Sequence, residues 1–287
     1  MRVAHLAATP PDSAAVREAQ QALFTSGVPG TWVTAAQCSP ERAVTEPGVT
    51  IYLHGGGFSF SNPPMEQILT HRLSQVTGRP AFAVDYRLAP THPFPAALED
   101  VVAVHRSLRD QGVPADRILL VGESAGATLV LSALLVLAEA GDATPAGAVA
   151  VSPLTDFAAE ASPSIEANTG RDVLNPDVLV SIGTQYLAGA RPDRAPQSPL
   201  YGELRGLPPL LLAVGGDEIL LDDAQRFAEA ASAANVPVDL DIYDGMPHGF
   251  HATVLFPEAE RLPTAATFLR RVADWATRLT AAQDRGR

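Results

Sequence analysis

A serine flanked by two glycines is the strongest chemical signal in the chain. Residues 122–126 read Gly-Glu-Ser-Ala-Gly, and they place Ser124 between an apolar run at 118–121 and a small, apolar stretch at 125–140. This pattern predicts a strand, a sharp turn and a buried helix. A serine on such a turn exposes its hydroxyl above a sheet, so Ser124 is predicted to be a catalytic nucleophile, in preference to a residue of an ordinary βα turn.

A glycine-rich segment earlier in the chain could supply backbone donors. It reads His-Gly-Gly-Gly at 54–57 and follows a β-prone run at 49–53. Glycines leave the backbone N–H groups uncovered, so the donors can point at a developing negative charge. Taken alone, the segment fits a floppy glycine loop equally well. Together with the serine turn downstream, it predicts an oxyanion hole.

The serine hydroxyl needs a base, and histidine serves best near neutral pH. The chain has seven histidines. His248 follows the last predicted strand, at 238–243, and lies in a loop with glycines nearby. The order of serine, acid and histidine that is typical of hydrolases selects His248.

The acid should lie between these two residues and at a strand end. Asp217 satisfies both conditions, because it follows the predicted strand at 210–214. Asp244 is the competitor at a strand end, whereas Asp222 and Asp223 are predicted to cap the next helix. Asp217 is therefore predicted to fix the imidazole tautomer and to stabilise the imidazolium.

No cofactor or metal is predicted. His248 and His251 are three residues apart with acidic residues nearby, but the sequence offers no further ligands of the kind that zinc requires. A single cysteine, Cys38, excludes an intramolecular disulfide and a cysteine-based metal site. Neither a phosphate-binding loop nor a dinucleotide fingerprint is present.

Alternating strands and helices must position these groups. The strands are predicted at 49–53, 81–86, 118–121, 148–151, 210–214 and 238–243, and the helices at 65–77, 94–111, 125–140, 220–235 and 264–280. This succession predicts an α/β fold with a mostly parallel central sheet flanked by helices. Short β-prone runs at 31–36 and 42–45 predict an antiparallel edge. Residues 157–205, rich in Pro, Ser, Asn and Gly, break the alternation and are predicted to cover the pocket.

The length, charge and apolar segments of the chain predict its domain number and exclude some classes of partner. We predict one domain over residues 1–287, with a helical cap formed by 1–29 and 157–205. A formal net charge of −12 argues against nucleic acid. The longest apolar segment falls short of the roughly 20 residues that span a bilayer, so no membrane span is predicted. No secretory signal is visible after Met1, and a cytoplasmic location is the expectation.

At this point the chain resembles a known family, the bacterial hormone-sensitive-lipase-like esterases of the α/β-hydrolase superfamily. The matching motifs occur in order from about residue 30 onward. They are His-Gly-Gly-Gly at 54–57, Asp-Tyr-Arg-Leu-Ala-Pro at 85–90, Gly-Glu-Ser-Ala-Gly at 122–126, Asp217, and His-Gly-Phe at 248–250. Two departures stand out. Glu123 occupies a position where the family often has Asp, and Asp-Glu-Ile at 217–219 replaces the usual Asp-Pro-Leu.

The resemblance implies an α/β-hydrolase fold with Ser124, Asp217 and His248 as the triad. It also implies that the backbone N–H groups of Gly56, Gly57 and Ala125 form the oxyanion hole. His54 and Gly55 would shape the glycine loop, with His54 not serving as the base. Phe58 and Phe60 are predicted to line the substrate pocket.

We therefore predict a serine carboxylic-ester hydrolase that acts on a small or medium ester through an acyl-enzyme. Lactone opening, deacetylation and a lyase-type elimination in specialised metabolism are alternatives on the same site. A binding protein that kept the fold and lost the chemistry is the non-enzymatic alternative. The expected partner is a small-molecule ester, and the expected assembly is a monomer or homodimer. The sequence leaves the acyl-chain preference and the stereoselectivity open.

Overall fold

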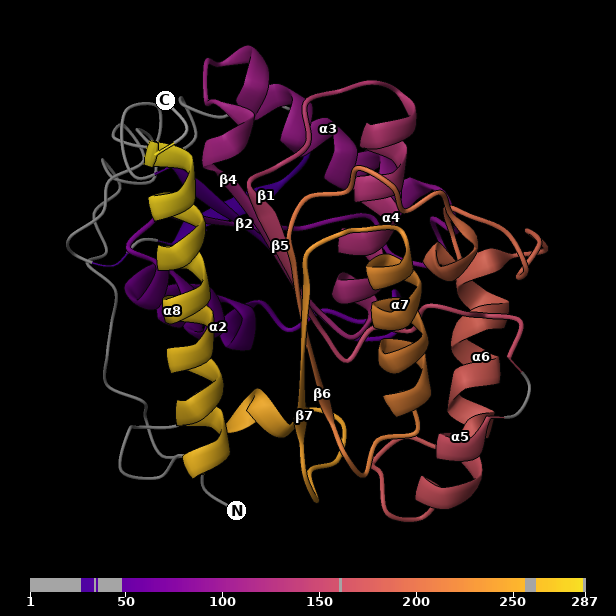
Figure 1. Cartoon of the computed structure of the whole chain (residues 1–287). Coiled ribbons are helices and arrows are strands. Elements are labelled where there is room, and N and C mark those ends of the chain that lie inside the picture. Colours follow the sequence, from indigo (N-terminus) through magenta and orange to yellow (C-terminus); the bar gives the residue numbers. More distant parts are fainter. Residues whose placement is uncertain (1–26, 34, 36–47, 160–161, 256–261, 286–287) are drawn as a thin grey trace.

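A twisted sheet with helices on both faces forms the body of the molecule (Figure 1). The computed structural model describes residues 27–33, 35, 48–159, 162–255 and 262–285. The predicted strand at 42–45 and most of the predicted N-terminal part of the cap lie outside these residues. None of the helices in these ranges is both long and apolar enough to cross a membrane.

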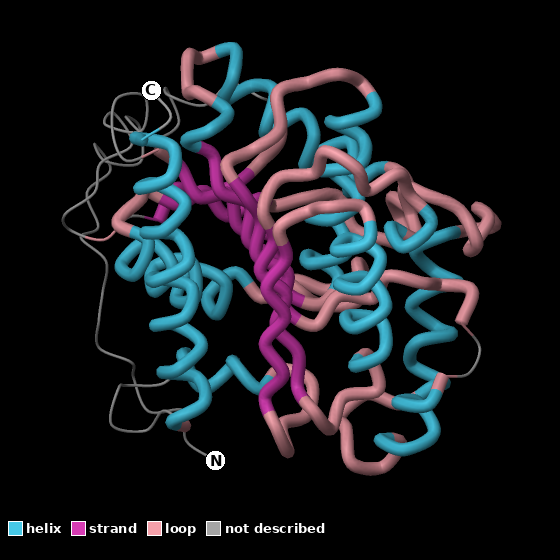
Figure 2. The backbone as a smooth tube through the Cα atoms, viewed as in Figure 1, coloured by secondary structure: helices cyan, strands magenta, loops and turns pink. Residues whose placement is uncertain are grey.

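Seven strands form the sheet in the spatial order β1-β3-β2-β4-β5-β6-β7. Figure 2 shows the strands in magenta, with helices on both sides of the sheet. They are β1 (Gly30–Val33), β2 (Val49–Leu53), β3 (Ala81–Val84), β4 (Ile118–Glu123), β5 (Gly147–Val151), β6 (Leu210–Gly215) and β7 (Val238–Tyr243). Strand β1 pairs antiparallel with β3, and all the other pairs are parallel. The predicted mostly parallel sheet and its antiparallel edge are both confirmed.

Helices pack on the two faces. They are α2 (Pro63–Thr77), α3 (Ala96–Asp110), α4 (Ala125–Glu139), α5 (Pro163–Asn168), α6 (Pro176–Leu187), α7 (Leu221–Ala233) and α8 (Pro263–Arg285). Short 3₁₀ turns are η2 (Ala115–Arg117), η3 (Pro199–Tyr201) and η4 (Phe250–Leu255). Helices α2 and α8 cover one face of the sheet, and α3, α4 and α7 cover the other (Figure 1).

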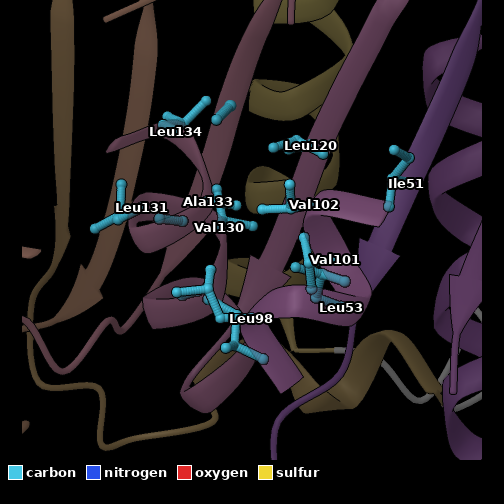
Figure 3. Packing of buried hydrophobic residues seen from close by; sticks show 14 of the residues in the cluster. Ile51, Leu53, Leu98, Val101, Val102, Leu120, Val130, Leu131, Ala133 and Leu134 are labelled. Atoms are coloured by element: carbon cyan, nitrogen blue, oxygen red, sulfur yellow. The ribbon is translucent and has the colours of Figure 1, made fainter. Parts of the chain in front are cut away.

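The strands carry apolar side chains on both faces, as a parallel sheet buried on both sides requires. Along β4, Leu120 packs toward α3 and α4, whereas Leu119 and Val121 pack toward α2 and α8. Figure 3 shows Leu120 among side chains of α3 and α4. Helix α4 is apolar around nearly its whole circumference, because it lies between the sheet and its neighbouring helices. It therefore gives the serine turn a rigid, buried support.

The predicted break in the alternation lies between β5 and β6. This insertion, residues 157–205, carries α5, α6 and η3. Both α5 and α6 begin with a polar residue that caps the helix, because the side chains of Ser162 and Asn175 accept hydrogen bonds from the backbone N–H groups of Ile165 and Val178. The insertion leaves the sheet at the carboxyl ends of its strands, where ligands bind in α/β folds.

Candidate active site

The serine turn is a tight junction between β4 and α4. Ser124 has φ 52° and ψ −121°, a conformation that non-glycine residues seldom adopt. The two flanking glycines allow this turn because the backbones crowd together. A Cβ on Gly122 would lie 2.4 Å from the carbonyl oxygen of Gly126, and a Cβ on Gly126 would lie 2.2 Å from that of Leu53. The Ser124 N–H donates to Val151 O at 2.7 Å, which anchors the turn to β5.

His248 reaches this serine from the loop after β7. Its Nε2 atom lies 3.0 Å from Ser124 Oγ, and its Nδ1 atom lies 2.9 Å from Glu218 Oε2. A carboxylate only accepts hydrogen bonds, so Nδ1 carries a proton toward Glu218 and Nε2 is left to accept from the serine hydroxyl. The sequence-based prediction that Ser124 and His248 lie together agrees with this geometry, and their catalytic roles stay a proposal.

The carboxylate on His248 belongs to Glu218, so the prediction of Asp217 as the residue on the imidazole is wrong. Strand β6 ends at Gly215 and the chain turns there. Asp217 faces away and forms an ion pair with Arg171 at 2.9 Å. Glu218 turns back under the sheet end, where its Oε1 accepts from Gly215 N at 2.6 Å and from Ser152 Oγ at 2.7 Å.

Glu218 is fully buried, and the N–H of Gly215, the hydroxyl of Ser152 and the imidazole of His248 hold its carboxylate. Burial alone would lower the pKa of His248. The hydrogen bond and negative charge of Glu218 outweigh burial and, helped by the charges of Asp172 and Glu123, raise the pKa of His248 above its usual value. The imidazole therefore binds a proton more tightly than an ordinary histidine, as a stronger base does.

The glycine loop after β2 lies directly against the serine turn. A Cβ on Gly55 would lie 3.3 Å from Ser124 Cβ. Gly56 has φ 108°, and a Cβ there would lie 2.1 Å from Phe60 O, so only glycine fits. Ala125 is the first residue of α4, where backbone N–H groups have no partner within the helix. Donation by Gly56, Gly57 and Ala125 to an oxyanion stays a prediction.

His54 lies at the base of the same loop and is buried. Its Nδ1 is 2.6 Å from Gly55 O, and its ring stacks on Tyr86 with centroids 4.2 Å apart. Tyr86 also donates its hydroxyl to His54 O at 2.8 Å. These contacts connect His54 to the loop backbone, and its predicted loop-shaping role fits them.

The two phenylalanines predicted to line the pocket differ in their surroundings. Phe58 is buried and stacks on Tyr186 of α6, with ring centroids 3.8 Å apart, and Phe157 lies 6.0 Å from it. Phe60 is 63% exposed. Phe58 therefore joins the glycine loop to the insertion through an aromatic cluster, and the pocket roles of both residues stay predictions.

A second histidine and a second glutamate lie behind the serine turn, and sequence reasoning assigned them no role. Glu123 ends β4, and its Oε2 pairs with His251 Nε2 from η4. Its Oε1 accepts from Tyr52 Oη at 2.7 Å and from Gly55 N at 3.4 Å. Burial would raise the pKa of Glu123, but the charge of His251 and these hydrogen bonds lower it to about 2. The three-residue spacing of His248 and His251 is the one signal in the sequence that points to this second histidine.

The chain matches known proteins over most of its length. Residues 50–252 match a family described as having the alpha/beta hydrolase fold. An acetyl-hydrolase of Streptomyces hygroscopicus is 39% identical over 266 residues, which are 91% of this chain and 89% of the relative. An esterase of Acinetobacter venetianus is 35% identical over 231 residues, 79% of this chain and 74% of the relative.

Solved structures agree. An esterase from the bacterial hormone-sensitive lipase family superimposes with a TM-score of 0.82 at 33% identity, covering 96% of this chain and 94% of that protein. A hormone-sensitive lipase from a metagenome library gives 0.80 at 33% identity, with coverages of 88% and 83%. The resemblance seen in the motifs is thereby confirmed. The chain belongs to the bacterial hormone-sensitive-lipase family within the α/β-hydrolase fold, and it is a carboxylic ester hydrolase.

Proposed function

We propose that the chain hydrolyses small carboxylic esters through an acyl-enzyme, with Ser124 as nucleophile, His248 as general base and Glu218 as the acid. The single observation that carries this proposal is the line of contacts from carboxylate to imidazole to hydroxyl, 2.9 Å and 3.0 Å long. Each side chain comes from the carboxyl end of a different strand, and the order along the chain is serine, acid, histidine.

In the first half of the reaction, Ser124 Oγ bonds to the ester carbonyl carbon while its proton moves to His248 Nε2. The carbonyl electrons move onto the oxygen, which accepts hydrogen bonds from the N–H groups of Gly56, Gly57 and Ala125. The tetrahedral intermediate then expels the alcohol, which takes the proton from Nε2. Glu218 keeps its negative charge throughout and stabilises the imidazolium.

In the second half, water repeats the sequence on the acyl-serine. His248 takes a proton from the water as the oxygen attacks the acyl carbon, and it returns that proton to Ser124 Oγ when the acid leaves. The products are a carboxylic acid and free enzyme. This half distinguishes a hydrolase from an acyl-transfer enzyme that excludes water.

Short acyl groups are the proposed substrates. Ile182 of α6 packs onto the glycine loop so closely that a Cβ on Gly57 would lie 2.9 Å from Ile182 Cγ1. We propose that the insertion 157–205 caps the site and that Ile182 limits the room beside the oxyanion donors. The acetyl-hydrolase relative supports the same size class and favours deacetylation of an acetyl ester as the natural reaction.

Ser124→Ala tests the chemistry. The variant should lose p-nitrophenyl acetate hydrolysis by several orders of magnitude, as removal of a triad nucleophile does elsewhere. A fluorophosphonate probe should label the parent chain once, at Ser124, and leave the variant unlabelled. Near-parental hydrolysis by a folded Ser124→Ala protein would reject the assignment.

A substrate panel tests the size class and separates the alternatives. p-Nitrophenyl esters of rising acyl length, run beside simple lactones and acetamides, should show the highest kcat/KM for acetyl or propionyl esters. A preference for a lactone or an amide would replace the ester proposal by one of those activities. Light scattering on the same sample would distinguish between the two expected assemblies, a monomer and a homodimer.

A further inference from the structure

One carboxylate in the insertion touches both loops that carry the base and the acid. Asp172 lies between α5 and α6. Its Oδ1 accepts from the backbone N–H of His248 at 2.8 Å, and its Oδ2 accepts from that of Ile219 at 2.8 Å. Oδ1 also accepts from Val173 N at 2.7 Å, which fixes the carboxylate on its own turn.

The two oxygens therefore bridge two segments that are far apart in sequence. Ile219 directly follows the proposed acid, Glu218, and His248 is the proposed base. A carboxylate has a fixed distance between its oxygens, so the two backbone groups are held at a fixed separation. That separation bears directly on the contact between Glu218 and His248, which is 2.9 Å long.

Neighbouring residues of the insertion bind the same loop. The side-chain amide of Asn168, at the end of α5, donates to Gly216 O at 3.2 Å and to Glu218 O at 2.8 Å. Arg171 pairs with Asp217 at 2.9 Å. Figure 1 shows α5 near the carboxyl ends of β6 and β7, as these contacts require. One short stretch of the insertion thus binds both backbone N–H and backbone carbonyl groups of the loop that carries Glu218.

We propose that Asp172 is a positioning residue that couples the insertion to catalysis by holding the Glu218 and His248 loops in register. The inference rests on the proposed function of Glu218 and His248. Asp172 contacts neither Ser124 nor the reacting atoms, and it acts through the backbone. Misplacement of a catalytic group by about 1 Å can lower a rate about 100-fold, so a bridge of this kind has kinetic consequences.

Asp172 also contributes to the electrostatics of His248. The charged or reactive groups that face the imidazole are Glu218 from the loop after β6, Ser124 and Glu123 from the serine turn, and Asp172 from the insertion. The negative charges of Glu218, Asp172 and Glu123 all favour the imidazolium. Loss of the Asp172 charge should therefore lower the pKa of His248. The contact with Glu218 should preserve most of the rise in that pKa.

Asp172→Asn tests both parts of the inference. An amide accepts through only one atom and turns its NH₂ toward the other backbone N–H, so the bridge breaks. We expect kcat for p-nitrophenyl acetate to fall about fivefold or more, with KM within about threefold of the parent. Asp177→Asn, on the exposed first turn of α6, removes the same charge from the same insertion and should leave kcat unchanged.

A second readout does not depend on activity. NMR titration of the His248 imidazole, assigned by its loss in His248→Gln, should show a lower pKa in Asp172→Asn than in Asp177→Asn. Inactivity of the parent, or full activity of Ser124→Ala, would contradict the proposed function. The titration would still test whether Asp172 acts on His248. A fall in kcat of less than fivefold, or equal His248 pKa values in the two variants, would overturn the role of Asp172.

Asp172→Glu keeps the inference testable if the asparagine variant does not fold. The longer side chain keeps the charge and displaces the oxygens by one methylene. Asp172→Glu should lower kcat about fivefold or more. The pKa of His248 should stay closer to the parent value than it does in Asp172→Asn. Parental kcat in a folded Asp172→Glu protein would show that the bridge geometry does not matter and would end the proposal.

Discussion

Two glutamate–histidine pairs lie beside the serine turn, and they use the same chemistry differently. Glu218 pairs with His248, and Glu123 pairs with His251. Each carboxylate comes from the end of a parallel strand, and the two histidines are three residues apart along one loop and turn. The sequence selects His248 as the base by its place after the last strand, and it does not reveal either pair.

The difference lies at the second nitrogen of each imidazole. His248 presents Nε2 to Ser124 Oγ at 3.0 Å, so this nitrogen can accept the proton of the serine hydroxyl. His251 uses Nε2 for Glu123, and its Nδ1 has no hydrogen-bond partner among the residues that the structure describes. Glu123 is also held by Tyr52 and Gly55. We propose that the first pair moves a proton, whereas the second joins β2, β4, the glycine loop and η4.

Replacement of each histidine by asparagine should separate the two roles most sharply. His248→Asn removes the base and should lower kcat on the order of 10⁶-fold, because triad members act as a unit. His251→Asn removes only a contact behind the turn and should lower kcat by at most about tenfold. Both are measured with p-nitrophenyl acetate on folded protein, and similar losses in the two variants would contradict the division of roles.

The carboxylates provide the next comparison. Glu218→Gln leaves the shape but removes the charge that holds the imidazole tautomer, and kcat should fall by up to about 10⁴-fold. Asp217→Asn removes an ion pair with an exposed arginine, which is worth little, so kcat should stay within about twofold. The reverse ranking, with Asp217→Asn the more damaging change, would restore the acid expected from the sequence.

These neighbouring acids show how far the sequence could lead. The chain order of serine, acid and histidine and the placement at strand ends selected the two loops that meet at Ser124, and the α/β fold followed from the alternation of apolar runs. Which of two adjacent acids turns inward depends on the backbone after Gly215, where Glu218 accepts from the N–H of that glycine. No pattern of residue types encodes that direction.

The second pair lay further from prediction. Glu123 and His251 are 128 positions apart and meet only because η4 packs beside the end of β4. In the sequence, Glu123 stands out only as a departure from the family motif, and His251 only by its spacing from His248. A contact between them follows from tertiary packing, which periodicity and motif spacing do not specify. The same holds for Asp172, whose partners lie in two other loops.

Loss of the Glu123 charge should reduce the stability of the fold more than it reduces the catalytic rate. The pKa of Glu123 is lowered to about 2 from an ordinary value of 4.5, so its ion pair stabilises the fold above about pH 4.5 and is lost as the pH falls toward 2. Its side chain is 22% exposed, so we expect Glu123→Gln to cost about 2 kcal/mol at pH 7. Urea unfolding should give a smaller difference from the parent at about pH 4, and an equal or larger difference there would contradict the assignment.

The smallest expected effect connects the two pairs. The pKa of His248 is raised above 6.5, and catalysis needs the neutral imidazole, so the acid limb of the kcat/KM profile should lie above that of an ordinary histidine. The charge of Glu123 contributes to this rise, so Glu123→Gln should move the limb to lower pH. Glu229→Gln, exposed on α7, is the matched control and should not move it. Coinciding limbs for the parent and Glu123→Gln would show that the pair behind the turn acts on the fold alone and not on the base.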